Sequence, residues 1–325
     1  MIKIEKQLPF FDQVEKELTV LDYKLVHRGK VRDIYTHRCP EGNESLLALT
    51  TDRISAFDVV SKQEIPYKGQ ILNMIAAFFL FKVKAEGICP VWLQDTPNQN
   101  TSIGVKCTPL KLEMVIRRYL TGTNIWEKYK NGQRNFCGII LPDGMYENQM
   151  FDVPIITPTT KAEEGHDENI SPEEAIAMGL VTEDQYSAME GYTRAIFDLG
   201  EKHAIKNDLI LVDTKYEFGA DPSGAVMLMD EVHTPDSSRY WELVGHYTRN
   251  RNSEPPVQLS KEFLREWLVG QGFKGMQDQV FPVMPQEVID EVSNRYIGLY
   301  ERITGQKFVP ENISVHEFVD RIIAA

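Results

Sequence analysis

The chain has 325 residues, of which 42% are hydrophobic and 26% charged, a composition typical of a soluble globular protein with one or two domains. Its net charge of -13 argues against a general nucleic-acid-binding protein, which needs a broad basic surface, but permits a small anionic substrate in a local cationic pocket. The four cysteines have no CxxC or His-paired spacing, which favours reduced thiols in a cytoplasmic protein. No signal peptide opens the chain, and the most apolar run, 71–83, is too short to cross a bilayer.

The first part of the chain is predicted to be a small mixed domain. Two strands, 24–27 and 33–36, flank the basic turn Arg28–Arg32 (RGKVR). Backbone amides and cationic side chains at the tip of such a turn can bind phosphate groups. Taken alone, however, this stretch favours a plain hairpin with a basic tip.

A polar loop and a buried helix follow. The loop 51–58 (TDRISAFD) carries Asp, Arg and Ser side chains that either bind a ligand or close turns. The stretch from Lys68 to Glu86 has helical length and is apolar almost all round, which predicts a buried helix, and Gly87 is its expected end.

Further along, a strand at 113–116 leads into RRYLTGTN (117–124) and then a helix at 125–129. Arginines at the end of a strand, followed by a Thr-Gly-Thr turn into a helix, form a plausible pocket for phosphate or carboxylate. An N-cap beside surface arginines explains the same residues equally well.

The loop 154–171 is long and polar, and loops of this length are usually functional or disordered. Its prolines and clustered ionisable groups favour a function. Capping boxes at Ser171 and Thr182 then predict the starts of two helices, the second reaching about Asn207.

The densest group of charges lies in the stretch 209–241. Period-two alternation predicts a strand that puts Asp213, Lys215 and Glu217 on one face. Acidic side chains on a strand that is otherwise buried are costly unless a cation or a metal neutralises them, and oxygen ligands suit magnesium bound to nucleotide phosphates. The alternative is a solvated sheet face with ordinary salt bridges.

After a turn centred near Pro222, the chain is predicted to return as a second strand that ends on Asp230 and Glu231. In a straight hairpin Asp230 lies opposite Thr214, roughly 10 Å along the strand from Glu217. One metal ion cannot span that distance. Either a bulge closes the gap, or the two carboxylates hold separate metal ions.

Beyond Trp241 the chain is expected to be structural. Helices are predicted from Ser260, over 285–304 and from Ser314. The hexapeptide at 270–275 spells GxGxxG, but it follows a helix and not a strand, so it does not predict a dinucleotide site.

Six motifs occur in order within residues 27–241: HRGKVRDIY, TDRISAFD, IRRYLTGT, TPTTKAEEGHDEN, LVDTKYEFG and DEVHTPDSSRYW. Together they resemble the phosphoribosylaminoimidazole-succinocarboxamide synthase (SAICAR synthetase) family. The resemblance implies an α+β fold with a small N-terminal antiparallel β domain that clamps nucleotide, residues 1–115. A larger ATP-grasp-like α+β domain with C-terminal helices, residues 116–325, would follow.

The resemblance implies an ATP-dependent ligase of de novo purine biosynthesis. Such an enzyme joins the carboxylate of carboxyaminoimidazole ribonucleotide (CAIR) to the amine of L-aspartate, giving SAICAR, ADP and phosphate. Because a carboxylate is a poor electrophile, an acyl phosphate intermediate is expected, with the protein supplying position and charge. The implied partners are these small molecules, without nucleic acid or membrane, and the protein is expected to be a cytoplasmic monomer or homodimer.

The implied nucleotide and reaction site uses residues from both predicted domains. The ATP-binding residues are Gly29, Lys30, Arg32 and Glu113. The magnesium ligands are Glu217 and Asp230, and the residues facing the imidazole end of the ribonucleotide are Asp213 and Lys215.

The implied substrate residues fall into two sets. Those for the ribonucleotide phosphate are Arg117, Thr123 and Arg239, where Thr123 replaces the serine common in the family and keeps the hydroxyl. Those for aspartate, taken from the remaining polar motifs, are Ser55, Asp58, Lys161, His166 and Asp167.

Two other functions are weighed against the ligase. A kinase-like phosphotransferase would also use a lysine over phosphates and acids on magnesium, but the chain has neither an HRD-like loop nor a DFG-like metal site. An inactive nucleotide-binding protein or scaffold would have lost phosphate-binding or acidic residues, yet Lys30, Lys215, Glu217 and Asp230 are all present.

Overall fold

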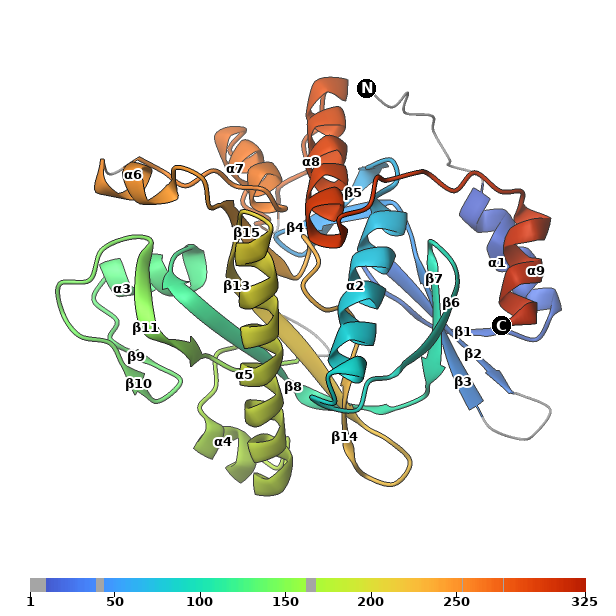
Figure 1. Cartoon of the computed structure of the whole chain (residues 1–325), viewed down its shortest axis with the longest axis horizontal. Helices are drawn as coiled ribbons and strands as arrows, with labels where there is room; N and C mark the ends of the chain where they lie inside the picture. The colour runs from blue at the N-terminus through green and yellow to red at the C-terminus, as the bar shows by residue number, and fades with distance from the viewer. Residues whose placement is uncertain (1–9, 39–43, 162–167, 253, 277) are drawn as a thin grey trace.

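The computed structural model describes residues 10–38, 44–161, 168–252, 254–276 and 278–325. Two antiparallel sheets dominate it (Figure 1). The sheet of the N-terminal part has the order β1-β2-β3-β7-β6, with β1 (Lys24–Arg28), β2 (Arg32–Arg38), β3 (Glu44–Thr50), β6 (Leu93–Asn98) and β7 (Thr101–Val105). A separate hairpin pairs β4 (Arg53–Ala56) with β5 (Val59–Glu64).

The second sheet is six-stranded, and its strands hold six of the expected site residues: Glu113, Arg117, Asp213, Lys215, Glu217 and Arg239. Its central path β11-β8-β13-β14 consists of β11 (Gln149–Ile156), β8 (Thr108–Leu120), β13 (Leu209–Ala220) and β14 (Val226–Met229). Two shorter strands join it: β12 (Thr159–Thr160) on β8 and β15 (Ser238–Glu242) on β13. A small hairpin, β9 (Asn135–Phe136) with β10 (Ile139–Ile140), lies beside this sheet.

Several helices of the described chain lie where the sequence predicts them, whereas those at Phe10–Val20 and His246–Arg251 were not predicted. They are α1 (Phe10–Val20), α2 (Lys68–Ala85), the π-helix η1 (Thr123–Glu127), α3 (Lys128–Lys130), α4 (Pro172–Ala177), α5 (Glu183–Lys206), α6 (His246–Arg251), α7 (Glu262–Gly270), α8 (Gln286–Thr304) and α9 (Val315–Ala324). Both predicted capping boxes, at Ser171 and Thr182, are formed. Within the described residues, no helix is at once long enough and apolar enough to cross a membrane.

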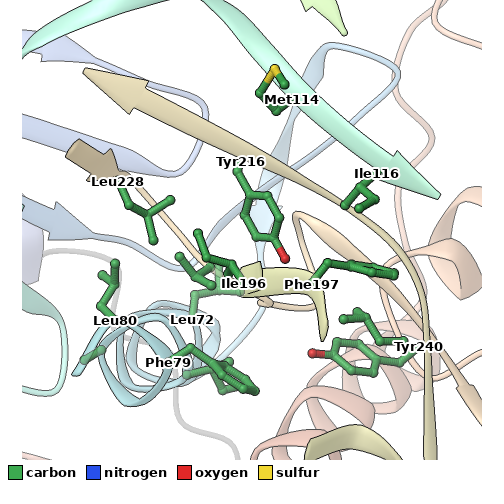
Figure 2. Packing of buried hydrophobic residues seen from close by; sticks show 14 of the residues in the cluster. Leu72, Phe79, Leu80, Met114, Ile116, Ile196, Phe197, Tyr216, Leu228 and Tyr240 are labelled. Carbon is green, nitrogen blue, oxygen red and sulfur yellow. The ribbon is translucent and has the colours of Figure 1, made fainter. Parts of the chain in front are cut away.

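The main core lies between one face of the six-stranded sheet and the helices α2 and α5 (Figure 2). Tyr216 and Phe218 of β13 belong to it and are fully buried, together with Phe79 of α2 and Phe197 of α5. The prediction that α2 is a buried helix is confirmed. Because this face of β13 is occupied by apolar packing, its charged side chains must all lie on the opposite face.

A second core joins the two ends of the described chain. Leu18 of α1 and Phe318 of α9 pack with Tyr35 and Leu47 of the five-stranded sheet. Helices α1 and α9 accordingly lie side by side next to that sheet (Figure 1). The last helix therefore covers the N-terminal sheet. The boundary expected between residues 115 and 116 lies within β8, and the division into two domains there stays a prediction.

The predicted register of the hairpin 209–231 is wrong. Ala220 lies opposite Val226 and Glu217 opposite Met229, so the hairpin is centred on residue 223. The Asp221 carboxylate shapes the turn, because it accepts hydrogen bonds from the backbone amides of residues 223 and 225 at 2.8 and 2.9 Å. Asp230 consequently follows directly after the residue opposite Glu217. The expected gap of roughly 10 Å between the two carboxylates does not exist.

Backbone hydrogen bonds tie the two sheets together at β14. The amide of Leu228 donates to the carbonyl of Pro90 at 2.9 Å, and the amide of Trp92 donates to the carbonyl of Leu228 at 2.9 Å. This short parallel bridge sets the end of β14 beside the N-terminal sheet. Side chains after residue 229 are thereby brought within reach of the basic turn.

Candidate active site

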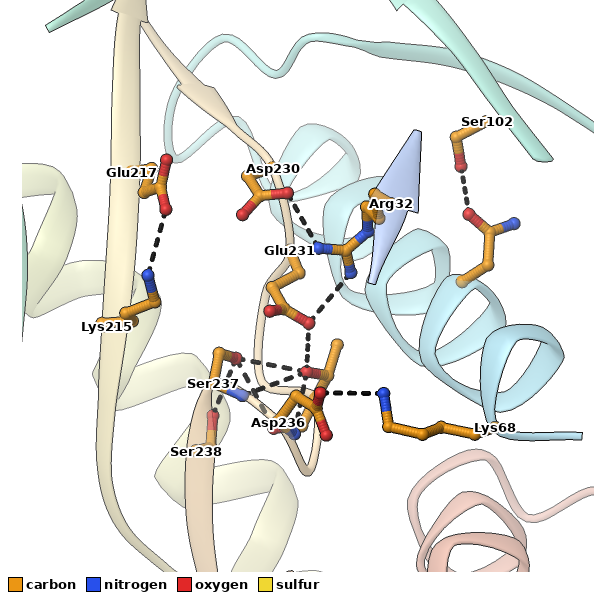
Figure 3. Close-up of polar contacts among 12 residues, drawn as sticks. Arg32, Lys68, Ser102, Lys215, Glu217, Asp230, Glu231, Asp236, Ser237 and Ser238 are labelled. Atoms are coloured by element: carbon orange, nitrogen blue, oxygen red, sulfur yellow. Dashed lines mark hydrogen bonds and ion pairs between the residues drawn. The ribbon is translucent and has the colours of Figure 1, made fainter. Parts of the chain in front are cut away.

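A row of alternating charges lies on the face of the six-stranded sheet opposite the main core, and Figure 3 shows two of its members, Lys215 and Glu217. Glu113 of β8 lies opposite Glu217 of β13. The Lys215 ammonium group lies 2.7 Å from Glu113 Oε1 and 3.1 Å from Glu217 Oε1. On its other oxygen Glu217 pairs with Lys161, which follows β12. The predicted alternation of β13 is confirmed. The charged side chains do not form the solvated face weighed as the alternative, because the carboxylates of Glu113 and Glu217 are buried in an ionic row.

The ionic row fixes the charge state of its members. Burial alone would raise the pKa of Glu217, but the Lys215 and Lys161 ammonium groups outweigh it and lower that pKa to about 2. Burial opposes the charged form of Lys215, but the neighbouring Glu217 and Glu113 carboxylates raise its pKa above the ordinary range. Both groups are therefore ionised at neutral pH.

Arg32 links the N-terminal sheet to the end of β14. Its guanidinium lies 2.9 Å from Asp230 Oδ1 and 2.9 Å from Glu231 Oε2, and the side chain is 14% exposed (Figure 3). Burial raises the pKa of Asp230, an effect that Arg32 opposes. The indole of Trp92 also donates a hydrogen bond to the backbone carbonyl of Asp230 at 3.2 Å. Asp230 and Glu217 thus lie near each other with cations on both sides.

The loop 51–58 holds the basic turn in shape. Thr51 donates to the carbonyl of Val31 through its amide and its hydroxyl, at 2.9 and 2.8 Å. Arg53 binds Asp33 with both terminal nitrogens, at 3.0 and 2.6 Å, and donates to the carbonyl of Gly29 at 3.1 Å. These residues of the loop close turns, which is one of the two alternatives left open by the sequence.

Ser55 and Asp58, two of the residues expected to bind aspartate, belong to the same loop 51–58. Lys30, at the tip of the basic turn, forms an ion pair with Asp58. Ser55 is buried in β4, two residues after Arg53. Asp58 therefore contacts the expected ATP-binding turn, while the contacts of Lys161 are with Glu217. His166 and Asp167 lie outside the described residues.

A second charged cluster lies where β8, β13 and β15 run side by side. Asp213 Oδ2 is 3.3 Å from Arg117 Nη1 and 2.6 Å from Arg239 Nη1. The guanidinium of Arg239 lies flat against Gly122, where a Cβ atom would come within 2.5 Å of Nη2. Gly122 immediately precedes η1. The structure thus brings together two of the three residues expected for the ribonucleotide phosphate, and the side chain of Thr123 lies outside the described part.

Residues of the segment after Trp241 contact Arg239 of the second cluster and the nearby Asp236, which the sequence analysis did not predict. Arg239 Nε lies 3.3 Å from Glu262 of α7. Asp236 is buried and accepts contacts from Lys68 at 2.9 Å, Lys261 at 3.2 Å and the Tyr296 hydroxyl at 2.5 Å. Asp236 belongs to a sequence motif and could have been singled out. Lys261 and Glu262 carry no local signal, since they look like ordinary charges in the first turn of a helix.

The carboxylates fit a magnesium ion that arrives with a nucleotide better than a metal site made by protein alone. Over the described ranges, no three His, Cys, Asp or Glu side chains are grouped so as to hold a metal ion. Glu217 and Asp230 offer oxygen ligands, which magnesium prefers, and it commonly uses one or two carboxylates together with phosphates and water. The donor set matches that pattern.

Comparison with known proteins assigns the family. The model of the SAICAR synthetase family matches residues 25–280. The chain belongs to this family. Phosphoribosylaminoimidazole-succinocarboxamide synthase from Bacteroides fragilis is 49% identical over 317 residues, covering 95% of this chain and 98% of that protein. The enzyme of the same name from Bacteroides thetaiotaomicron is 50% identical over 305 residues, covering 92% and 95%.

Solved structures agree with this assignment. SAICAR-synthase from Saccharomyces cerevisiae, complexed with SAICAR, is 32% identical and superposes with a TM-score of 0.72, covering 89% of this chain and 97% of that one. The expected SAICAR synthase-like α+β fold is confirmed. The expected activity, ATP-dependent ligation of CAIR and L-aspartate in purine biosynthesis, is that of a SAICAR synthetase. The comparisons give no support to the kinase or inactive alternatives.

The lowered pKa of Glu217 predicts how the free energy of unfolding of this SAICAR synthetase changes in acid. A carboxylate whose pKa is lowered on folding stabilises the protein above its ordinary pKa of 4.5, and this stabilisation is lost as the pH falls towards about 2. Glu217→Gln should therefore reduce the free energy of unfolding at pH 6 by on the order of 2 kcal/mol, and by less at pH 3.5. Urea unfolding at both pH values measures the difference.

The exposed pair of Glu190 with Arg194 provides the control, because Glu190→Gln should change the unfolding free energy little at either pH. An equal loss for Glu217→Gln at pH 6 and pH 3.5 would contradict the lowered pKa.

Proposed function

We propose that the ionic row and the end of β14 bind magnesium and ATP, and that the cluster around Asp213 binds the ribonucleotide beside them. The observation that carries this proposal is the contact of Arg32 with Asp230 at 2.9 Å. It joins the basic turn, suited to phosphates, to a carboxylate suited to magnesium. Asp230 in turn lies near Glu217 and Lys215, so phosphate, metal and reacting carboxylate would meet in one place.

In this proposal the phosphates of ATP lie over the basic turn. Gly29 allows the backbone to approach, while Lys30 and Arg32 supply positive charge. Lys30 and Arg32 are paired with Asp58 and with Asp230 and Glu231, so phosphate oxygens would take over part of these contacts. Glu113 would keep Lys215 oriented through their 2.7 Å contact.

Glu217 and Asp230 would hold magnesium, which supplies charge neutralisation on the phosphates when bound. Both carboxylates have cationic partners, Lys161 and Arg32, that compensate their charge before a metal arrives. The low pKa of Glu217, about 2, keeps this ligand ionised at any physiological pH. A metal can therefore bind without first removing a proton from Glu217.

The ribonucleotide phosphate would bind Arg117, Arg239 and Thr123. Arg239 is held by Asp213 and Glu262 on two of its nitrogens and lies against Gly122 at the start of η1. A phosphate there would meet a pre-oriented guanidinium, and little side-chain entropy would be lost on binding.

The CAIR carboxylate would then face Lys215 and Asp213 on β13. Phosphorylation by ATP converts it into an acyl phosphate, whose phosphate leaves when the aspartate amine attacks. Lys215 would neutralise the charge that develops on the transferred phosphoryl group. Lys161 lies beside Glu217 and would contact a carboxylate of aspartate, with Ser55, Asp58, His166 and Asp167 as the further residues proposed for this substrate.

Asp230→Asn tests the magnesium site. The substitution keeps size but removes the negative charge, so kcat should fall on the order of 100-fold or more. Steady-state assays at varied magnesium should also show a higher magnesium requirement. Asp198→Asn, in an exposed pair of α5, is the control and should behave as the wild type. Near-normal kcat at ordinary magnesium would remove Asp230 from the metal site.

Arg239→Ala tests the phosphate pocket. Loss of a charge-assisted contact should raise the KM for CAIR about 10- to 100-fold, while the KM for ATP stays within about twofold. Arg249→Ala, in an exposed part of α6, should leave both constants unchanged. If Arg239→Ala binds CAIR as tightly as the wild type, the ribonucleotide phosphate lies elsewhere.

Release of ADP with one substrate omitted tests the acyl phosphate. With CAIR and magnesium-ATP but no aspartate, slow ADP release should persist, because an acyl phosphate forms and is hydrolysed by water. Without CAIR, no release is expected. Strict dependence on aspartate, with a burst of ADP also absent, would contradict phosphorylation before the amine attacks.

A further inference from the structure

The segment that follows β14 has an uncommon backbone. Asp230 and His233 have φ angles of +59° and +56°, in the left-handed region that residues other than glycine rarely adopt. Two such residues within four positions persist only when their surroundings hold them in place. Because Asp230 is a proposed magnesium ligand, whatever holds this segment also aims that ligand.

His233 anchors the segment 230–233 to the main core. Its side chain is fully buried, and Nε2 lies 2.5 Å from the hydroxyl of Tyr216 on β13. Its backbone carbonyl accepts a hydrogen bond from the Tyr240 hydroxyl of β15 at 2.9 Å. The ring also packs edge-on against Phe79 of α2, with 4.6 Å between ring centroids. Tyr216, Tyr240 and Phe79 appear together in Figure 2, within the main core.

A glycine in α5 provides the space for the imidazole. A Cβ atom at Gly200 would lie 2.2 Å from Cε1 of His233 and 2.7 Å from Nδ1. Glycine in the middle of a helix is unfavourable compared with alanine, so the helix gains nothing from it locally. The same helix contains Gly191, around which a Cβ atom would meet nothing within 4 Å. Of these two glycines, Gly200 is the one at which a side chain would clash with its neighbours.

His233 acts by packing and not by carrying a proton. Burial lowers the pKa of its imidazole to about 3, so the ring is neutral at physiological pH. Over the described part of the chain, its Nδ1 has no hydrogen-bond partner. The ring therefore acts through its shape and its single bond to Tyr216.

We infer that His233 is a positioning residue for Asp230, one of the two proposed magnesium ligands. Its imidazole packs against Gly200 and is hydrogen-bonded to Tyr216, which fixes one end of the segment 230–233. At the other end, the indole of Trp92 donates a hydrogen bond to the carbonyl of Asp230. With both ends fixed, the Asp230 carboxylate is kept facing Glu217. This inference rests on the proposed role of Asp230 in binding magnesium.

Gly200→Ala tests the inference without touching any proposed ligand. Its methyl group displaces the His233 ring, which should turn Asp230 away from Glu217. Calorimetric titration with ADP, with and without magnesium, measures how much the metal strengthens ADP binding. Gly200→Ala should lower this enhancement about tenfold and leave the affinity for CAIR unchanged. Gly191→Ala is the matched control and should keep the full enhancement with an equal or higher Tm.

Two further variants separate positioning from simple packing. Tyr216→Phe removes only the hydroxyl, keeps the buried ring and should fold normally, with a two- to fivefold lower enhancement. His233→Ala should lower the enhancement as Gly200→Ala does, and adding Gly200→Ala to it should cause no further loss, because the methyl group then meets no ring. If Gly200→Ala lowers the magnesium enhancement equally in the wild type and in His233→Ala, Gly200 acts without His233. That result overturns the inference.

Asp230→Asn distinguishes the two possible failures. If it keeps the full magnesium enhancement, the metal assignment fails and the inference fails with it. If it loses the enhancement while Gly200→Ala, His233→Ala and Tyr216→Phe keep theirs and show only a lower Tm, the metal assignment stands and His233 is a packing residue alone.

Discussion

The contact of Arg32 with Asp230 and Glu231 is the interaction on which the rest of the site depends. It joins two sheets across a largely buried interface, where a charge without a partner would be very costly. Removing either side would leave a buried ion, so the two sheets are held in one relative position. The backbone bridge at Leu228 acts at the same place. The proposed nucleotide site therefore has walls from two separate sheets, and the charges on those walls are matched.

Buried charge also links the C-terminal segment, which follows Trp241, to the proposed site. Asp236, in the loop after Glu231, is neutralised by Lys68 and Lys261. Burial lowers the pKa of Lys261 to about 8, an effect that Asp236 opposes. Lys261 precedes α7, whose first residue, Glu262, binds Arg239. The segment after Trp241 thus contacts both the loop that contains Asp236 and the side chain of Arg239. A segment without recognisable motifs contributes through the partners it provides.

Local patterns predicted local structure well. Strand alternation correctly separated Tyr216 from Lys215 and Glu217, and the capping boxes located two helices, because both signals depend on neighbouring residues. The hairpin register was wrong, since it depends on how Asp221 folds the turn. The pairing of Arg32 with Asp230 spans 198 positions, and the fit of His233 over Gly200 depends on packing between distant elements. Neither has a signature within one stretch of sequence. The roles of individual site residues stay predictions.

The most direct test of the account is a crystal structure of the protein with magnesium and a non-hydrolysable ATP analogue. The account predicts oxygen atoms of Glu217 and Asp230 at about 2.0–2.1 Å from magnesium, with Arg32 and Lys30 turned towards the phosphates. It also predicts that Lys161 leaves Glu217. A magnesium ion bound only by phosphate and water, with the Arg32–Asp230 and Lys161–Glu217 pairs intact, would contradict it.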